Sequence, residues 1–220
     1  MTINFVNKVC PVCGKEAEYK EINSYSVFGS PGLDRKPNNS MKPLGEEIQE
    51  CPYCHYCNYD ISKLIESRFA NNLELWNNDE EIQEIIKTET GALRKYLLLA
   101  KMYENKMDYL GMYYALINAG WLSEKEKAKK YLHDALSVYI WEILPTVRSD
   151  LMQLADIARQ CEYFDVASDV LGAVHHLINE DDQEHYKFEE NFIHYELSLI
   201  EKQNSAPHNI DEIPEQHEHK

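Results

Sequence analysis

Several features of common protein classes are missing from this chain of 220 residues. No run approaches eighteen uninterrupted apolar residues, so no membrane-spanning helix is expected. The start, MTINFVNKVC, has neither the charged region nor the apolar stretch of a secretory signal, so we expect cytoplasmic residence. Basic residues are scarce: 22 Lys and Arg against 38 Asp and Glu give a net charge of −16, which disfavours binding to nucleic-acid phosphates.

The usual catalytic signatures are also missing. The chain has no glycine-rich phosphate loop, no nucleophile elbow and no HExxH pair. A thioredoxin-type redox role would need a CxxC pair inside a βαβ unit, which the sequence does not predict. We therefore predict no catalytic or cofactor-binding residues, and an enzymatic role is disfavoured but left open.

Composition divides the chain into three parts. Residues 1–59 contain five of the six cysteines and five of the eight prolines, a mixture that disfavours long helices. Residues 60–203 have helical periodicity, interrupted only by Pro145. Residues 204–220 have many charges and few apolar groups, so we expect a disordered acidic tail.

The long middle part predicts antiparallel helices with short connections. Its first apolar stripe, Ile61, Leu64, Ile65 and Phe69, predicts a helix that begins near Asp60. A later helix is expected between a capping box, formed by Ser123 and Glu126, and Pro145.

Two segments of this part repeat each other at an offset of about 55 residues. The pairs are Ala100 with Ala155, Tyr109 with Phe164, Met112 with Ala167, Leu116 with Leu171, and Ala119 with Val174. Small residues allow two helices to approach closely, and an aromatic side chain fills the turn between them. The spacing resembles the helical pair of tetratricopeptide repeats, although Met112 is not small and the offset is longer than usual.

The most specific motif is CPxC, which occurs as CPVCG at 10–14 and CPYCH at 51–55. A CxxC turn directs two thiolates at one centre, and proline after the first cysteine stiffens the turn. Two such turns supply a tetrahedron of four sulfurs, which suits zinc and is possible for a mononuclear iron. The predicted metal ligands are therefore Cys10, Cys13, Cys51 and Cys54.

The second turn leaves alternatives open, because Cys57 also forms CxxC with Cys54 and because His55 can ligate zinc. We favour Cys51 with Cys54, since this pair repeats the proline of the first turn. His55 then stands where the first turn has Gly14, at a position that often needs a left-handed backbone.

Between the two turns lies a loop with the core FGSPGLDRKP. CPVCG, this loop, CPYCHYCNYD and the paired helices together resemble an uncharacterised bacterial family that joins a CPxC zinc ribbon to tetratricopeptide-like helices. The resemblance implies the same four cysteine ligands and makes Asp34 and Arg35 family-like loop residues. It implies no reaction.

We therefore expect a mainly α protein: a small N-terminal zinc ribbon followed by a tetratricopeptide-like helical bundle. The expected function is a zinc-binding interaction or scaffold module for a protein or peptide partner. The acidic composition of the chain favours a basic partner. One alternative is an enzyme that uses Asp34 and Arg35 in a pocket between loop and helices. The other is a nucleic-acid-binding zinc ribbon, which the net charge disfavours.

Overall fold

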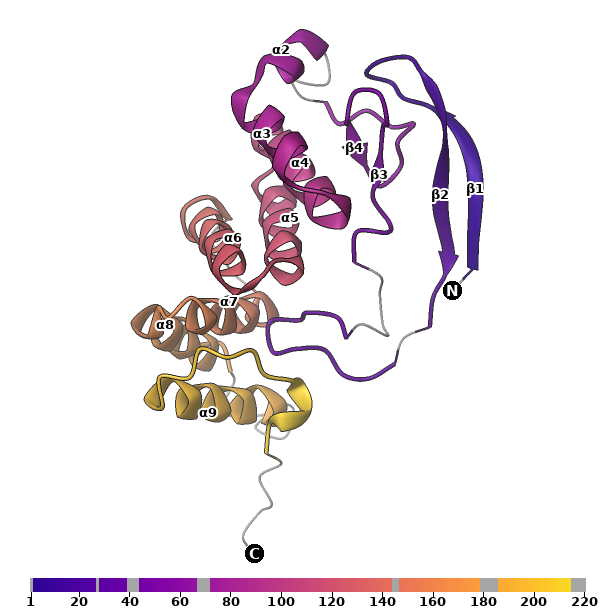
Figure 1. Ribbon diagram of the computed structural model, residues 1–220. Coiled ribbons are helices and arrows are strands. Elements are labelled where there is room, and N and C mark those ends of the chain that lie inside the picture. The colour runs from indigo at the N-terminus through magenta and orange to yellow at the C-terminus, as the bar shows by residue number, and fades with distance from the viewer. Residues whose placement is uncertain are drawn as a thin grey trace, which may run out of the picture. The chain divides into compact units, whose positions relative to one another are not determined.

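The computed structural model describes residues 2–26, 28–38, 44–66, 72–143, 147–178 and 186–214. The chain divides into two compact units (Figure 1). Unit 1 comprises residues 1–27 and 39–143, and unit 2 comprises residues 28–38 and 144–220. Strands occur near the N-terminus and helices follow, so the predicted fold class, mainly helical with a small N-terminal ribbon of strands, is confirmed.

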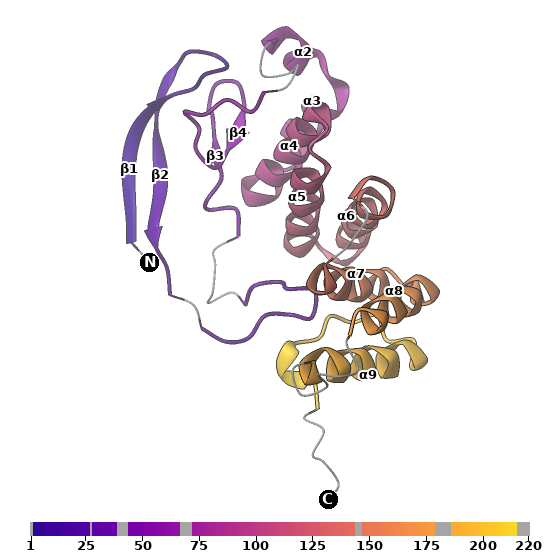
Figure 2. The same ribbon diagram turned by 180° about the vertical axis from the view of Figure 1, so that it is seen from behind.

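Unit 1 begins with two β-hairpins. Strands β1 (Thr2–Val9) and β2 (Glu16–Ser24) pair antiparallel, and so do β3 (Gln49–Glu50) and β4 (Cys57–Asn58). Each hairpin carries one CPxC motif in its turn. The short second hairpin lies between the first hairpin and the helices of unit 1 (Figures 1 and 2).

Short connections join the successive helices of unit 1. They are α2 (Leu73–Asn78), α3 (Glu80–Thr88), α4 (Gly91–Lys106), α5 (Tyr109–Leu122) and α6 (Lys125–Val138), which continues as a π-helical turn, η1 (Tyr139–Ile143). Side chains of Asn72, Asp79 and Asp108 accept hydrogen bonds from first-turn N–H groups and so fix where α2, α3 and α5 begin. The buried face of α4 shares one apolar core with both hairpins.

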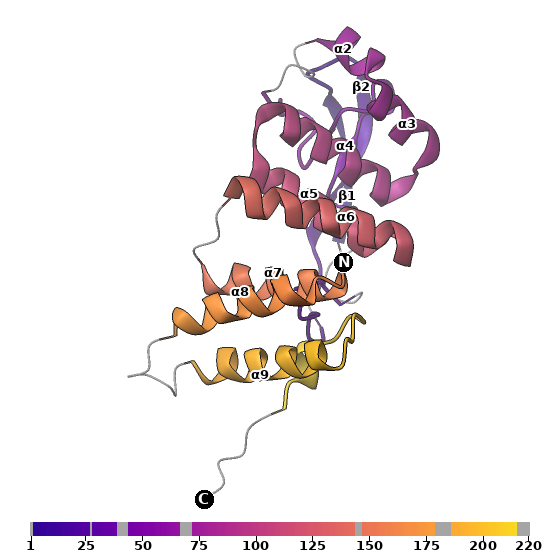
Figure 3. The ribbon, with the colours of Figure 1, turned by 90° about the vertical axis from the view of Figure 1, so that its left-hand side faces the viewer.

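Unit 2 consists of α7 (Arg148–Gln160), α8 (Phe164–His176), α9 (Lys187–Glu201) and a short 3₁₀ turn, η3 (Ile210–Glu212). The three helices run alongside one another (Figure 3). Helix α7 is buried along residues 151–159 and so forms the centre of this unit.

Loop 28–38 belongs to unit 2 although it lies between the CPxC motifs in sequence. The backbone N–H of Leu33 donates to His208 O, and that of Ile210 donates to Pro31 O. We call residues 204–213 the C-terminal strap. This segment forms an isolated antiparallel β-bridge with loop 28–38, between Asn209 and Gly32. The loop contributes Leu33 to the apolar core of α7, α8 and α9.

The internal repeat has a geometric counterpart. Helix pairs α4–α5 and α7–α8 are each joined by a turn with one left-handed residue, Met107 (φ 61°) and Glu162 (φ 66°), which are 55 positions apart. Both turns close with the same pair of backbone hydrogen bonds, Met107 to Glu104 and Asp108 to Tyr103 in the first. The small residues Ala119 and Ala155 are fully buried, as the repeat predicts. The two pairs therefore share one turn geometry, while their tetratricopeptide character stays a prediction.

The expected helix at Asp60 is absent from residues 60–66, and Phe69 lies outside the described residues. Ile61 and Ile65 are buried, but their backbone groups are bound by side chains. The N–H of Ile61 donates to Gln49, and that of Ile65 donates to the Tyr56 hydroxyl. Apolar residues three and four positions apart therefore indicate core contacts in this segment, although the segment is not helical.

Two further expectations need correction. The Ser123 hydroxyl donates to Ala119 O at the end of α5, so no Ser123–Glu126 capping box forms, and α6 is preceded by Glu124. Residues 204–214, expected as part of a disordered tail, are hydrogen-bonded to loop 28–38 and to α7. Pro145 and residues 215–220 lie outside the described residues.

Candidate metal centre

The two CPxC turns have the same backbone hydrogen bonds. In the first turn, Gly14 N–H donates to Cys10 O and Cys10 N–H donates to Lys15 O. In the second, His55 N–H donates to Cys51 O and Cys51 N–H donates to Tyr56 O. Each hairpin thus presents its two cysteines from one tight turn.

The two turns bring four sulfurs together. The Sγ atoms of Cys10, Cys13, Cys51 and Cys54 all lie within 4.8 Å of one another. Cys10 Sγ is 3.7 Å from Cys54 Sγ, and Cys13 Sγ is 3.6 Å from Cys51 Sγ, so neither pair is a disulfide. In a tetrahedron with Zn–S bonds of about 2.3 Å, neighbouring sulfurs are about 3.8 Å apart. The four cysteines can therefore hold a metal ion such as zinc.

Backbone N–H groups stabilise negative charge on these sulfurs. The Cys54 thiol, with the N–H groups of Cys13 and Val12, lowers the pKa of the Cys10 thiol to about 5. Lys15 N–H donates to Cys13, and Tyr56 N–H donates to Cys54. Such donors compensate for the excess charge of a four-thiolate site.

The hydroxyl of Tyr19 gives an independent test of whether the site fits a metal-bound thiolate. It is buried and has no hydrogen-bond partner among the described residues. Burial, followed by the nearby Cys51 sulfur, raises the pKa of Tyr19 above its ordinary range, so the hydroxyl keeps its proton. A thiolate at Cys51 supplies the acceptor that this buried donor lacks.

The second turn is fastened to the helices of unit 1. The buried indole of Trp76, on α2, donates to Cys54 O at 2.8 Å. Glu50, on β3, binds His55 Nδ1 at 2.7 Å and Arg94 of α4 at 3.0 Å. Ligand geometry in the second turn is therefore coupled to the start of the helical part.

Cys57 and His55 lie outside the sulfur cluster. The Cys57 thiol is fully buried and donates to His55 O at 3.4 Å, and burial raises its pKa well above the ordinary value. His55 has φ 59° where Gly14 has φ 71°, so it occupies the left-handed position that the sequence comparison of the turns predicts. Pairing with Glu50 offsets part of the strain at His55.

Other residues singled out in the sequence lie elsewhere. Asp34 and Arg35 belong to unit 2, and Cys161 is a buried thiol at the end of α7. The supporting roles of Tyr19, Trp76 and Arg94 carry no recognisable signal in the sequence, because they depend on which segments meet around the turns.

Comparison with protein-family models, curated proteins and solved structures found no match. The resemblance to a bacterial zinc-ribbon family therefore stays a prediction, and the function has to be inferred from the chemistry of the sites. In the described part of the chain, no helix combines the length and the apolarity needed to cross a bilayer.

Proposed function

We propose that this chain is a zinc protein whose four-thiolate site, made by Cys10, Cys13, Cys51 and Cys54, holds the two hairpins of unit 1 together as a zinc ribbon. The observation that supports this most is the spacing of the four sulfurs, which matches a zinc tetrahedron. Four protein ligands leave no position for a substrate, so the zinc is structural.

The need for a structural ion follows from the shape of the first hairpin. Most of β1 is exposed, including Phe5 at 66%, so this strand pair buries little apolar surface. A two-stranded hairpin is marginal in water without other support. Zinc binding contributes on the order of 10 kcal/mol to the folding of small thiolate domains.

Elemental analysis of the purified protein tests the proposal. We expect about one zinc per chain; one iron per chain would keep the site and change the metal. A folded, metal-free protein by elemental analysis and circular dichroism would refute the proposal.

A groove in unit 1 supports the second part of the proposal, an interaction role. Helices α3, α4, α5 and α6 line a hollow of about 490 Å³. Its apolar residues include Leu97, Ala100, Met112 and Leu116. Its charged residues are four acids and two lysines: Glu81, Glu84, Glu104, Asp134, Lys101 and Lys130.

We infer that this groove takes a basic amphipathic segment of a partner protein. Lys101 is already paired with Glu81 and Glu104, which leaves Glu84 and Asp134 with a single lysine in the lining. An apolar groove with an acidic edge complements a helix that carries one apolar and one basic face. Charge complementarity of this kind mainly raises the association rate and makes it sensitive to salt.

Synthetic helical peptides with matched apolar faces and either lysine or glutamate on the polar face test this inference. The lysine peptide should bind more tightly, more so at low salt, and the double variant E84K and D134K should weaken it about tenfold or more. Glu126→Lys, at an exposed position of α6 outside the lining, is the matched control. Equal binding of both peptides would overturn the inference.

A nucleic-acid role is the weakest alternative. Residues 1–60 contain six basic and eight acidic side chains, and four thiolates with one divalent ion add two negative charges. This excess of negative charge disfavours contacts with phosphates. Retention of DNA or RNA at low salt would revive this alternative.

A further inference from the structure

Unit 2 contains a cavity whose lining residues all belong to that unit. It is open to solvent, has a volume of about 520 Å³, and lies between loop 28–38, the starts of α7 and α9, and η3. Its lining is mostly apolar, with Leu33, Met152 and Phe192 buried and Ile210 half-buried, and Gln153 is a buried polar member. Three exposed apolar residues, Val147, Leu177 and Phe188, stand in the outer lining. Both the volume and the apolar lining are typical of small-molecule sites.

Two arginines, Arg35 and Arg148, bring positive charge to this apolar cavity. Each arginine stands beside one carboxylate, Asp150 for Arg35 and Glu189 for Arg148. Arg148 belongs to the first turn of α7, where the helix dipole adds partial positive charge.

Both guanidinium groups have N–H groups to spare. Within the described residues, the Arg35 side chain donates only through Nη1, to Asp150 Oδ1 at 3.1 Å. Arg148 donates through Nη1 to Leu177 O, and its Nε is 3.8 Å from Glu189, beyond hydrogen-bonding distance. A guanidinium group has five N–H donors and favours planar anions such as carboxylates.

The backbone of loop 28–38 holds Arg35 in a strained position. Arg35 has φ 65°, which costs a side-chain-bearing residue about 1–2 kcal/mol. Its N–H donates to Gly32 O, and the buried Asp34 side chain accepts from Lys36 N–H. A Cβ at Gly32 would lie 2.5 Å from Asp34 Oδ1, so a larger residue there would displace the Asp34 carboxylate. Gln153 of α7 donates to Asp34 O at 2.6 Å, which fixes the turn against the cavity wall.

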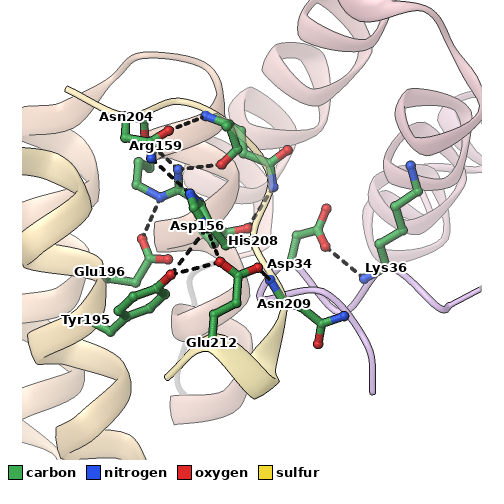
Figure 4. Close-up of polar contacts among 12 residues, drawn as sticks. Asp34, Lys36, Asp156, Arg159, Tyr195, Glu196, Asn204, His208, Asn209 and Glu212 are labelled. Carbon is green, nitrogen blue, oxygen red and sulfur yellow. Dashed lines mark hydrogen bonds and ion pairs between the residues drawn. The ribbon is translucent and has the colours of Figure 1, made fainter. Parts of the chain in front are cut away.

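The C-terminal strap, which pairs with loop 28–38, contributes Ile210 to the lining and is fixed by buried polar contacts (Figure 4). Arg159, fully buried on α7, donates to Asn204 O and Ala206 O. Asn209 bridges to loop 28–38 by donating to Ser30 O, and its side chain caps η3, which places Ile210 in the lining. The cavity is therefore formed before a ligand arrives.

We propose that this cavity binds a small apolar carboxylate, with its carboxylate between Arg35 and Arg148 and its hydrocarbon part on Leu33, Met152, Phe192 and Ile210. Two guanidinium groups that each already stand beside one carboxylate match a monoanion better than a dianionic phosphate. The mostly apolar lining favours a ligand whose body is hydrocarbon. This proposal is independent of the zinc site, because every residue that it uses lies in unit 2.

The test is calorimetric titration of the full-length, metal-loaded protein with octanoate, octanamide and octyl phosphate. Octanoate should saturate one site and bind at least tenfold more tightly than octanamide, which has the same length without the charge. Octyl phosphate should not bind more tightly than octanoate. Absence of saturation, equal binding of the amide, or tighter binding of the phosphate would each overturn the proposal.

Variants locate the binding. Arg35→Gln and Arg148→Gln should each weaken octanoate about tenfold and leave octanamide nearly unchanged. Lys202→Gln, an exposed charge removal in unit 2 outside the cavity, is the matched control. Phe188→Ala should weaken both ligands, whereas Phe28→Ala, which removes an exposed phenylalanine outside the lining, should weaken neither. An octanoate affinity that is unchanged in both arginine variants would place the ligand elsewhere and refute the assignment.

Discussion

The two units differ in how each compensates a buried cluster of groups that can carry negative charge. Unit 1 gathers four cysteine sulfurs that can hold a metal ion, and its described residues include no buried lysine or arginine. Unit 2 buries Asp156 and Glu196 around Arg159, with the side chains of all three at 0% exposure. Unit 2 therefore supplies its own cation.

On the proposed function, the folding of unit 1 is linked to metal supply, whereas the folding of unit 2 is linked to protons. Burial, followed by the Asp156 charge, raises the pKa of Glu196 to about 9. One oxygen of this carboxyl has no hydrogen-bond partner in the described structure. Protonation removes the charge that burial penalises, and it leaves Asp156 and Arg159 as a neutral pair.

The largest expected effect is the loss of unit 1 on metal removal. All three tryptophans, Trp76, Trp121 and Trp141, belong to unit 1, and the buried Trp76 is bonded to Cys54 O. A strong chelator, or Cys51→Ser, should shift tryptophan emission to the red as unit 1 opens. Hydrogen exchange should show that α7 and α9 stay protected.

Cys57→Ser is the matched control for that change. It alters a buried cysteine next to the cluster and should leave both zinc content and tryptophan emission unchanged, because Cys57 lies outside the four sulfurs. Loss of zinc in Cys57→Ser with retention in Cys51→Ser would show that the alternative register is correct.

The next effect concerns the cation of unit 2. Arg159→Met leaves two buried carboxyl groups without their cation and should destabilise unit 2 by about 3–5 kcal/mol. Hydrogen exchange of the C-terminal strap should rise, because Arg159 holds Asn204 and Ala206. Zinc content should not change, and Lys202→Met is the exposed control. Unchanged strap exchange would show that the strap does not depend on Arg159.

The pH dependence of unit 2 follows from Glu196. Its folded pKa of about 9 lies above the ordinary value of 4.5, so unit 2 binds an extra proton on folding between these pH values. The contribution of Glu196 to the free energy of unfolding is fully present below pH about 4.5 and decreases as the pH rises towards 9. Urea unfolding followed by exchange in α7 should show this fall in the native protein and a flatter curve in Glu196→Gln. A steeper fall in the variant would contradict the assignment.

The smallest effect tests the shared turn geometry. Met107 and Glu162 are left-handed at equivalent points of the two helix pairs. Met107→Gly should stabilise unit 1, and Glu162→Gly should stabilise unit 2, each by about 1 kcal/mol, because glycine adopts this conformation without a Cβ clash. Tryptophan emission and exchange in α7, respectively, measure the two effects. Destabilisation by either change would show that the side chain contributes more than the strain costs.

The sequence predicted the parts of this architecture that depend on local chemistry. Two CPxC turns with proline in the same place identified the four cysteines that meet, and the apolar repeat identified two helix pairs whose turns match. Glycine in the first turn correctly predicted that His55 adopts a left-handed backbone.

The remainder depends on contacts between distant segments. Loop 28–38 looked like an insert between metal ligands, yet Leu33 packs in unit 2 and its backbone pairs with His208. The strap reads as a charged tail because its order comes from backbone hydrogen bonds and from Arg159, which composition does not reveal. Ile61 and Ile65 suggested a helix because core contacts can mimic helical spacing.

The central claim, a four-sulfur zinc site, is tested most directly by X-ray absorption at the zinc edge of the purified protein. The account predicts four sulfur neighbours at about 2.3 Å and no nitrogen or oxygen neighbour. A shell of three sulfurs with one nitrogen would place His55 or another histidine in the site and contradict the assignment of Cys10, Cys13, Cys51 and Cys54.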